Sequence, residues 1–219
     1  MVVGPEARPQ RRDAARNRAL LLSAADDYLA ERGLPIAFNS LARYAGVGVG
    51  TVYRHFTGPD ELLDALMDRR VDAVVATLDR AAEVEDPIAG LRQAILGICK
   101  LQAGDRSVTQ ALTGSWSRFE TVRARLLPPT RQIVERARAS GRMRPEFAQT
   151  DFAILIWLGG ALHAHAGAVE PRLWIRYVEA LLDGFLGAAE PRQPLSFEAL
   201  DVERMDLVVH RENRTKEAS

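Results

Sequence analysis

The chain has 219 residues, of which 47% are hydrophobic, and its 29 lysines and arginines balance its 29 aspartates and glutamates. Its length and apolar content suffice for one or two small domains with a buried core, and zero formal net charge excludes a protein that binds polyanions through its overall charge. The single cysteine, Cys99, excludes an internal disulfide and is typical of a reducing, cytoplasmic setting.

Along most of the chain, apolar side chains recur every three or four residues, and no segment shows a convincing two-residue alternation. This pattern predicts an all-α protein with about nine helices.

The first segment, residues 8–18, is rich in arginine and contains one acidic residue, Asp13. Such a segment suits contact with phosphates or with a minor groove, and a solvated, disordered terminus is the alternative. Asp13 is a candidate cap for a first helix that ends at Gly33. Because no apolar run follows the basic residues, we expect no secretion signal and a cytoplasmic protein. The five arginines are Arg8, Arg11, Arg12, Arg16 and Arg18.

Residues 38–57 have the pattern of a helix-turn-helix motif. A short helix ends near Ala45, and Gly46 supplies the left-handed turn that side chains disfavour. Val47 is expected to pack inside the turn, and a second short helix runs to about Phe56, with Val52 and Phe56 on its buried side. Next to this motif, Pro59 takes the first position of another helix, with acidic residues in its first turn. The motif predicts DNA binding.

The motif also has a more specific likeness. The series A-G-V-x-x-G-T-x-Y-x-H-F, from Ala45 to Phe56, resembles the DNA-binding helices of the TetR/AcrR family of transcriptional regulators. A second group of residues resembles the first helix of that family: Leu21, Leu22, Ala24, Ala25, Leu29 and Gly33. The resemblance implies a DNA-binding domain over residues 12–70, with its helix-turn-helix at 38–57, and a ligand-binding and dimerisation domain over residues 71–190. Residues 191–219 form a tail whose composition predicts partial disorder.

Three residues depart from the family's pattern. Gly48 stands in place of the Ser or Thr that caps the recognition helix, Pro59 in place of a Lys, and Ala37 in place of a Thr. Glycine at a helix cap costs only a few tenths of a kcal/mol relative to serine. These departures predict weaker nonspecific affinity for DNA, without changing the assignment.

We expect the second helix of the motif to enter the major groove. Val49 is placed for contact with a thymine methyl, Arg54 for contact with guanine or phosphate, and Gly50 for close backbone approach. Three further residues of this helix are expected on phosphates: Thr51, Tyr53 and His55. For Tyr53 and His55 the alternative is packing inside the domain. The remaining candidate DNA contacts are Arg43 and Tyr44, beside the groove, and Arg16 and Arg18, in the arginine-rich arm.

The middle of the chain is predicted to be helical throughout. A long helix over residues 59–80 joins the DNA-binding domain to the rest of the chain. The next helix starts at Asp86-Pro87 and ends near Gly104, and a short one covers residues 107–112. In the helix over residues 115–140, Pro128 and Pro129 are expected to kink or break the chain near Leu126.

Residues 152–169 contain no charged side chain apart from two histidines. Several glycines and alanines make a membrane span improbable for this segment, so we predict a helix that is buried on all sides. With the last helix, residues 171–186, it would supply the dimer interface that a helix-turn-helix protein needs to bind paired half-sites. Burial in the core of a monomer is the alternative. The candidate interface residues are Gly159, Gly160, His163, Trp174, Tyr177, Leu181 and Phe185.

A site for a small-molecule effector is implied by the resemblance alone. Its candidate residues are Cys99, Trp116, Phe119 and Trp157, although each is more often a core residue. We expect no metal and no cofactor, because His163 and His165 lie two residues apart and point to different sides of a helix. No phosphate-binding loop, nucleophile elbow or metalloprotease motif is present, so we predict that the chain is not an enzyme.

Together these features predict a homodimeric regulator that binds a palindromic double-stranded operator and responds to a small molecule, most simply as a repressor. Activation stays open, since the sign depends on where the operator lies. An all-α small-molecule carrier whose N-terminal domain no longer binds DNA is the alternative, and Gly48 and Pro59 are the residues that favour it.

Overall fold

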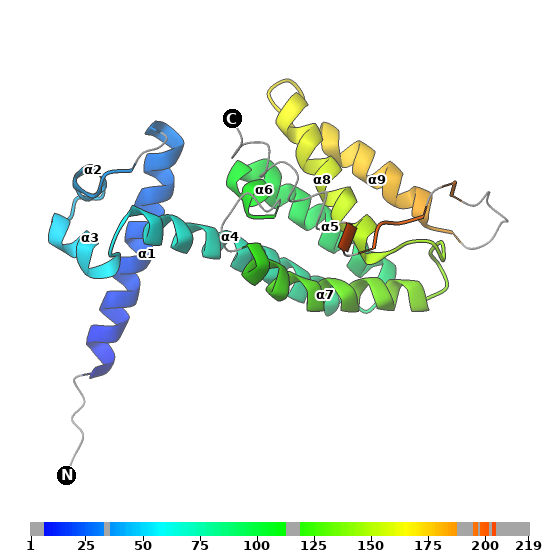
Figure 1. The fold of residues 1–219 in the computed structure, drawn as a ribbon, viewed down its shortest axis with the longest axis horizontal. Helices are drawn as coiled ribbons and strands as arrows, with labels where there is room; N and C mark the ends of the chain where they lie inside the picture. The colour runs from blue at the N-terminus through cyan, green and yellow to red at the C-terminus, as the bar shows by residue number, and fades with distance from the viewer. Residues whose placement is uncertain are drawn as a thin grey trace, which may run out of the picture. The chain divides into compact units, whose positions relative to one another are not determined.

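The computed structural model describes residues 7–32, 36–112, 119–187, 195–196, 198–201 and 203–204. Among these residues there is no strand, only helices and one isolated backbone bridge between Met143 and Leu186. The all-α prediction is therefore confirmed for the described part of the chain. In chain order the helices are α1 (Ala7–Arg32), α2 (Phe38–Tyr44), α3 (Val49–His55), α4 (Pro59–Ala82), α5 (Pro87–Gly104), α6 (Arg106–Leu112), α7 (Phe119–Ala139), α8 (Gln149–Ala166) and α9 (Leu173–Phe185) (Figure 1).

The chain folds as two compact units, Met1–Arg69 and Arg70–Ser219. Helices α1, α2, α3 and the first part of α4 share the core of the first unit. Short helices such as α2 and α3 gain their stability from this packing, because seven residues are too few for a helix to persist alone. The side chains buried most completely in this core are Leu21, Ala25, Leu41, Val52, Phe56, Leu62 and Leu66.

Helix α1 begins earlier than the sequence predicted. Its first residue is Ala7, so Asp13 lies inside the helix and does not cap it. Arginine and glutamine are good helix formers, and Pro9 lies in the first turn, where a missing N–H breaks no helical hydrogen bond. The arginine-rich segment therefore continues the helix toward the N-terminus.

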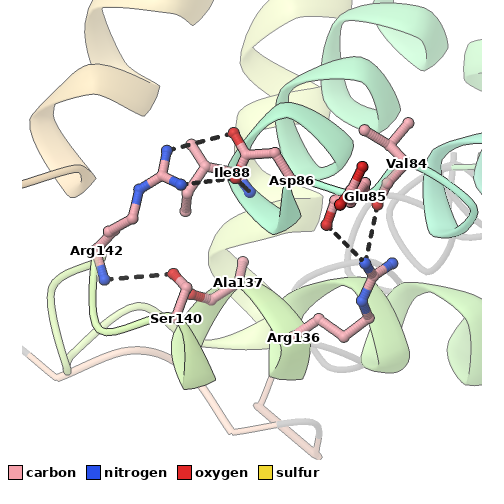
Figure 2. A network of polar contacts seen from close by, with 8 residues as sticks. All are labelled: Val84, Glu85, Asp86, Ile88, Arg136, Ala137, Ser140 and Arg142. Carbon is pink, nitrogen blue, oxygen red and sulfur yellow. Dashed lines mark hydrogen bonds and ion pairs between the residues drawn. The ribbon is translucent and has the colours of Figure 1, made fainter.

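Helix α4 begins at Pro59 and has Asp60 and Glu61 in its first turn, as predicted. It belongs to the first unit up to Arg69 and to the second unit from Arg70 onward. Its last turn and the turn that follows are held by Arg136 of α7, as Figure 2 shows in part. The Arg136 guanidinium donates hydrogen bonds to three backbone carbonyls: those of Ala82, of Val84 (2.9 Å) and of Glu85 (3.3 Å).

The start of α5 is fixed by a cap and an ion pair. Asp86 accepts a hydrogen bond from the backbone N–H of Ile88 at 3.3 Å, and Pro87 takes the first helical position, as predicted. Arg142 donates to Asp86 at 2.6 Å, and this hydrogen bond lowers the pKa of the Asp86 carboxyl (Figure 2). The residues that follow α7 therefore help to fix the junction between α4 and α5.

Helix α7 continues through Pro128 and Pro129, so the predicted break does not occur. The two prolines remove two backbone donors from the helix. In the next residue, the Thr130 hydroxyl donates to the carbonyl of Leu126 at 2.8 Å, which is a contact within the same helix and does not replace the lost donors. Ile133 and Val134, which follow the prolines, are buried in the core of the second unit. Tertiary packing thus holds the helix together where its local sequence opposes it.

Helices α5 and α8 approach each other closely at two glycines of α8. A Cβ atom on Gly159 would lie 2.6 Å from the Cys99 Sγ atom, and one on Gly160 would lie 3.0 Å from the Gln102 Nε2 atom. Only glycine permits contacts this short without displacing a neighbour. Both glycines therefore pack within one chain, and the prediction that they line a dimer interface is corrected.

The other side of α8 is open to solvent in the single chain. Leu158, Ala161 and His165 are exposed, so the prediction of a helix buried on all sides is wrong for one copy of the chain. The physical reason is that α5 and α9 cover only part of its circumference. None of the described helices is both long enough and apolar enough to cross a membrane.

Gly159→Ala is expected to lower the free energy of unfolding by about 1–3 kcal/mol, because the added methyl overlaps the Cys99 sulfur. Urea denaturation measures this change. Adding Cys99→Ala to the same chain should restore part of the loss, since it removes the overlapping atom. Gly184→Ala is the matched control: its Cβ meets nothing within 4 Å, and it should not destabilise the protein. Equal stability of Gly159→Ala and wild type would contradict the close approach.

Candidate DNA-binding interface

The turn between α2 and α3 has the geometry that the sequence predicted. Gly46 adopts a left-handed conformation with φ of 68°, and the backbone N–H of Val47 donates to the carbonyl of Ala42 at 2.9 Å. Gly48 caps α3 with extended backbone angles and offers no side-chain hydrogen bond. The turn is therefore set by backbone geometry, and α3 follows it at Val49.

One side of α3 is anchored in the first unit. Val52 is fully buried and Phe56, the residue after the helix, is 1% exposed, as predicted. Val47 differs from the prediction, because its side chain is exposed and does not pack the turn. The contact that holds the turn is the hydrogen bond of its backbone.

The opposite side of α3 faces solvent. Tyr53 is 59% exposed, and its ring and that of Phe38 pack in an edge-to-face arrangement with centroids 5.1 Å apart. Val49 and Arg54 are also exposed, and Arg54 Nη2 donates to the Thr51 hydroxyl at 3.2 Å. Thr51 and His55 are half-buried. Helical periodicity brings these side chains to the surface because Val52 occupies the core.

Gly50 lies at the second position of α3, and a Cβ on it would meet nothing within 4 Å. The backbone is therefore open to a close neighbour at the start of the helix. An approaching duplex backbone or base edge would meet no side chain at this position.

Tyr44 contributes mainly to packing between α2 and α1. Its hydroxyl donates to Glu31 Oε1 at 2.8 Å, and this hydrogen bond raises the pKa of the Tyr44 hydroxyl. Its ring meets the ring of Tyr28 edge-on, with centroids 5.6 Å apart. Arg43 is exposed. Arg43 and Tyr44 line a small surface hollow together with Arg32 and Ser40. The sequence motif did not indicate Arg32 or Ser40.

The two arginines predicted in the N-terminal arm differ in position. Arg16 is exposed. The Arg18 guanidinium instead lies over the ring of Phe56, 4.4 Å from its centroid, and its Nη1 atom is buried. A cation over an aromatic face is a stabilising contact, so Arg18 holds α1 against the end of the motif and is removed from the candidate DNA contacts.

The segment after α3 is fixed by Glu61 in the first turn of α4. Thr57 donates to Glu61 Oε2 through its backbone N–H at 2.7 Å and through its hydroxyl at 2.8 Å. These hydrogen bonds favour the ionised carboxylate and lower the pKa of Glu61. The link between α3 and α4 is thereby held close to the candidate interface.

Comparison with known proteins identifies the family of the helix-turn-helix residues. The model of bacterial regulatory proteins of the tetR family matches residues 21–66, which contain α2, α3 and the turn between them. Over 85 residues the chain is 38% identical to an HTH-type transcriptional regulator of Staphylococcus aureus. It is also 29% identical to the TetR transcription regulatory protein from Mycobacterium vanbaalenii, over 81% of this chain and 99% of that one, with a TM-score of 0.56. Residues 21–66 belong to the tetR family of bacterial regulatory proteins.

The extent of these likenesses differs. The match to the Staphylococcus aureus regulator covers 37% of this chain and 41% of that relative's length. The regulator PfmR from Thermus thermophilus shares the fold at 20% identity, with a TM-score of 0.61 over 78% of this chain and 99% of that one. TetR proteins are transcription regulators and not enzymes, in agreement with the sequence prediction.

Of the residues predicted to bind an effector, the structure describes the side chains of Cys99 and Trp157. Cys99 is buried against Gly159, and burial raises the pKa of its thiol to about 12. Trp157 is half-buried in α8. Trp116 and the side chain of Phe119 lie outside the described residues. Within the described residues, no group of three or more His, Cys, Asp or Glu side chains is placed to hold a metal ion.

The residues predicted at the dimer interface fall on two sides of α8 and α9. Trp174 is buried in the core of its own chain, and Phe185 packs on Phe147 with ring centroids 4.9 Å apart. Both are therefore removed from the candidate interface. Tyr177 and Leu181 are exposed, at 47% and 42%. Leu158 of α8, which the sequence reasoning did not single out, is also exposed. His163 is half-buried.

Glu61→Gln is expected to lower stability at neutral pH and to lose this effect in acid. Because the folded-state pKa of Glu61 lies below the ordinary value of 4.5, its carboxylate stabilises the fold above that value, and the contribution disappears as the pH falls through the lowered pKa. Urea midpoints of variant and wild type should converge on acidification. Thr57→Val removes one of the two donor groups. In that background, Glu61→Gln should lower the free energy of unfolding by less than it does in the wild type. A difference in urea midpoint that stays constant with pH would contradict the assigned contact between Thr57 and Glu61.

Proposed function

We propose that the chain is a homodimeric, DNA-binding transcriptional repressor that leaves a palindromic operator when a small-molecule effector binds. The observation that carries this proposal is the two-sided character of α3: Val52 anchors it in the core, while Val49, Tyr53 and Arg54 face outward. The match of residues 21–66 to the tetR family supports the same function. DNA as the partner is consistent with the cytoplasmic location expected from the sequence.

In the proposed complex α3 enters the major groove. Val49 contacts a thymine methyl, and Arg54 contacts guanine or phosphate. Tyr53, Thr51 and His55 bind phosphates and fix the register of the helix. Arg16 and Arg43 add phosphate contacts, which is the role that exposed arginines most often have at such interfaces. The hollow formed by Arg32, Ser40, Arg43 and Tyr44 has the donors to receive one further phosphate.

Two copies are needed because one such unit contacts few base pairs, and helix-turn-helix dimers bind half-sites about 34–36 Å apart. We place the dimer contact on the exposed apolar side chains of α8 and α9, namely Leu158, Tyr177 and Leu181. Aromatic and aliphatic side chains that remain exposed on neighbouring helices are typical of surfaces that a second chain covers.

Helix α4 is the element that we propose couples effector and DNA. Two consecutive arginines bind partners in different units: Arg69 pairs with Asp26 of the first unit at 3.2 Å, and Arg70 pairs with Asp105 of the second at 2.8 Å. Arg125 of α7 pairs with Asp72 of α4 at 2.5 Å. An effector that favours one arrangement of these helices by about 1–3 kcal/mol would change operator affinity about 5- to 150-fold.

Tyr53→Ala and Thr51→Ala are each expected to weaken DNA binding by about tenfold while leaving the fold intact, because each removes a hydrogen bond to a charged phosphate. Electrophoretic retardation of the DNA that flanks the protein's own gene measures the effect, and circular dichroism checks the fold. Thr121→Ala, an exposed threonine of α7, is the matched control. Unchanged retardation by both variants would refute the proposed interface. If the wild-type protein binds a ligand but retards no DNA, the alternative of a small-molecule carrier would be favoured.

Leu181→Glu is expected to turn the dimer into a monomer, because it buries a charge without a partner at the proposed contact. Size-exclusion chromatography with light scattering measures the mass. Val49→Glu makes the same kind of change at an exposed apolar residue of the first unit and should leave the mass unchanged. A Leu181→Glu protein that remains dimeric at low micromolar concentration would place the contact elsewhere.

A further inference from the structure

Gln102 is a polar side chain inside the apolar core of the second unit. It is 1% exposed, and neither its Nε2 nor its Oε1 atom has a hydrogen-bond partner. The buried threonines, in contrast, all have hydrogen-bond partners. The hydroxyls of Thr77, Thr130 and Thr150 donate to the carbonyls of Ala73, Leu126 and Leu200 at 2.8, 2.8 and 2.7 Å. Among the buried polar residues that the structure describes, Gln102 alone leaves its whole side-chain amide unpaired.

The amide occupies a space that Gly160 leaves open. A Cβ on Gly160 would lie 3.0 Å from Gln102 Nε2 and 3.2 Å from Gln102 Oε1. The side chain lies near the end of α5, where the core continues into Val108 of α6. The amide therefore lies between α5 and α8, in the part of the core that is next to α6.

A second unpaired group lies on the same helix as Gly160. The Nδ1 atom of His163 is buried and has no hydrogen-bond partner. It lies 2.8 Å from where a Cβ on Gly167 would stand, so the imidazole packs at the C-terminal end of α8 and is separate from the Gln102 amide at Gly160. An imidazole nitrogen donates or accepts one hydrogen bond, depending on its tautomer.

Unpaired buried polar groups cost free energy that an apolar side chain of equal length would avoid. Methionine has the length of glutamine and no polar amide, so the fold alone gives no reason for glutamine at this position. The unpaired amide therefore indicates a partner that is not part of the chain. Charge is disfavoured in this part of the core, since burial is the main cause that raises the pKa of the Cys99 thiol, three residues earlier on α5, to about 12.

We propose that Gln102 binds the polar end of the effector, and that the effector is a neutral carboxamide or lactam on an apolar body. The inference rests on the proposed function, in which a small molecule binds the second unit. The Gln102 N–H donates to the carbonyl oxygen of the ligand, and Gln102 Oε1 accepts the ligand's N–H. Two parallel hydrogen bonds then pair the two amides without burying a charge.

Calorimetry on the full-length chain tests the inference with matched probes. Hexanamide and decanamide are each compared with the methyl ketone of equal length, which keeps the acceptor and lacks the donor. Wild type is expected to bind the carboxamides about tenfold more tightly than the ketones. Gln102→Met should abolish this preference and raise the melting temperature of the ligand-free protein, since it removes the unpaired amide. Gln93→Met, an exposed glutamine on the same helix, should change neither.

Equal binding of carboxamides and ketones by wild type, no measurable binding of carboxamides, or a preference that survives Gln102→Met would each overturn the inference. Retardation of DNA by the ligand-free protein is measured in parallel. Retardation without a carboxamide preference would overturn only the inference about the effector, and a preference without retardation would overturn only the proposed function.

Discussion

The burial of Val52 and Phe56 is the interaction on which the candidate DNA interface depends. Helix α3 has seven residues and no side-chain cap at Gly48, so its own sequence does not stabilise it. Its position comes from the two side chains that enter the core and from the Arg18 guanidinium that covers the Phe56 ring at 4.4 Å. Once this side of the helix is fixed, the helical repeat brings Tyr53 to the solvent.

The second unit depends on a different constraint, the close approach of α8 to α5. Gly159 and Gly160 allow the backbone of α8 to lie against Cys99 and Gln102, and any side chain at these positions would separate the helices. The same approach encloses the Gln102 amide without a partner. The closest approach of the two helices and the unpaired amide therefore occur at the same place. The proposed effector contact is inferred from both.

Helix α4 connects these two constraints, because its residues take part in polar contacts of each unit. Arg69 pairs within the first unit and Arg70 within the second, while Arg136 binds the carbonyls at the end of the helix. Asp105 also accepts hydrogen bonds from Ser107, and although burial opposes the effect, these contacts lower the pKa of its carboxyl. The partner of Arg70 therefore stays ionised, and the junction between α5 and α6 remains linked to α4.

The sequence by itself determined the helix-turn-helix motif and several helix boundaries: the turn at Gly46, the starts of α4 and α5 at Pro59 and Pro87, and the candidate residues of α3. These features depend on neighbouring residues, whose spacing and backbone preferences are visible in a single chain. Only the tertiary structure decided which side of each helix faces inward. On α9 one apolar surface divides into Trp174, Val178 and Leu182, which are buried, and Tyr177 and Leu181, which are not. Likewise Arg18 packs on Phe56, and α7 continues through two prolines. The physical reason is that apolar periodicity marks a helix face, whereas burial and pairing depend on partners that lie far away in the sequence.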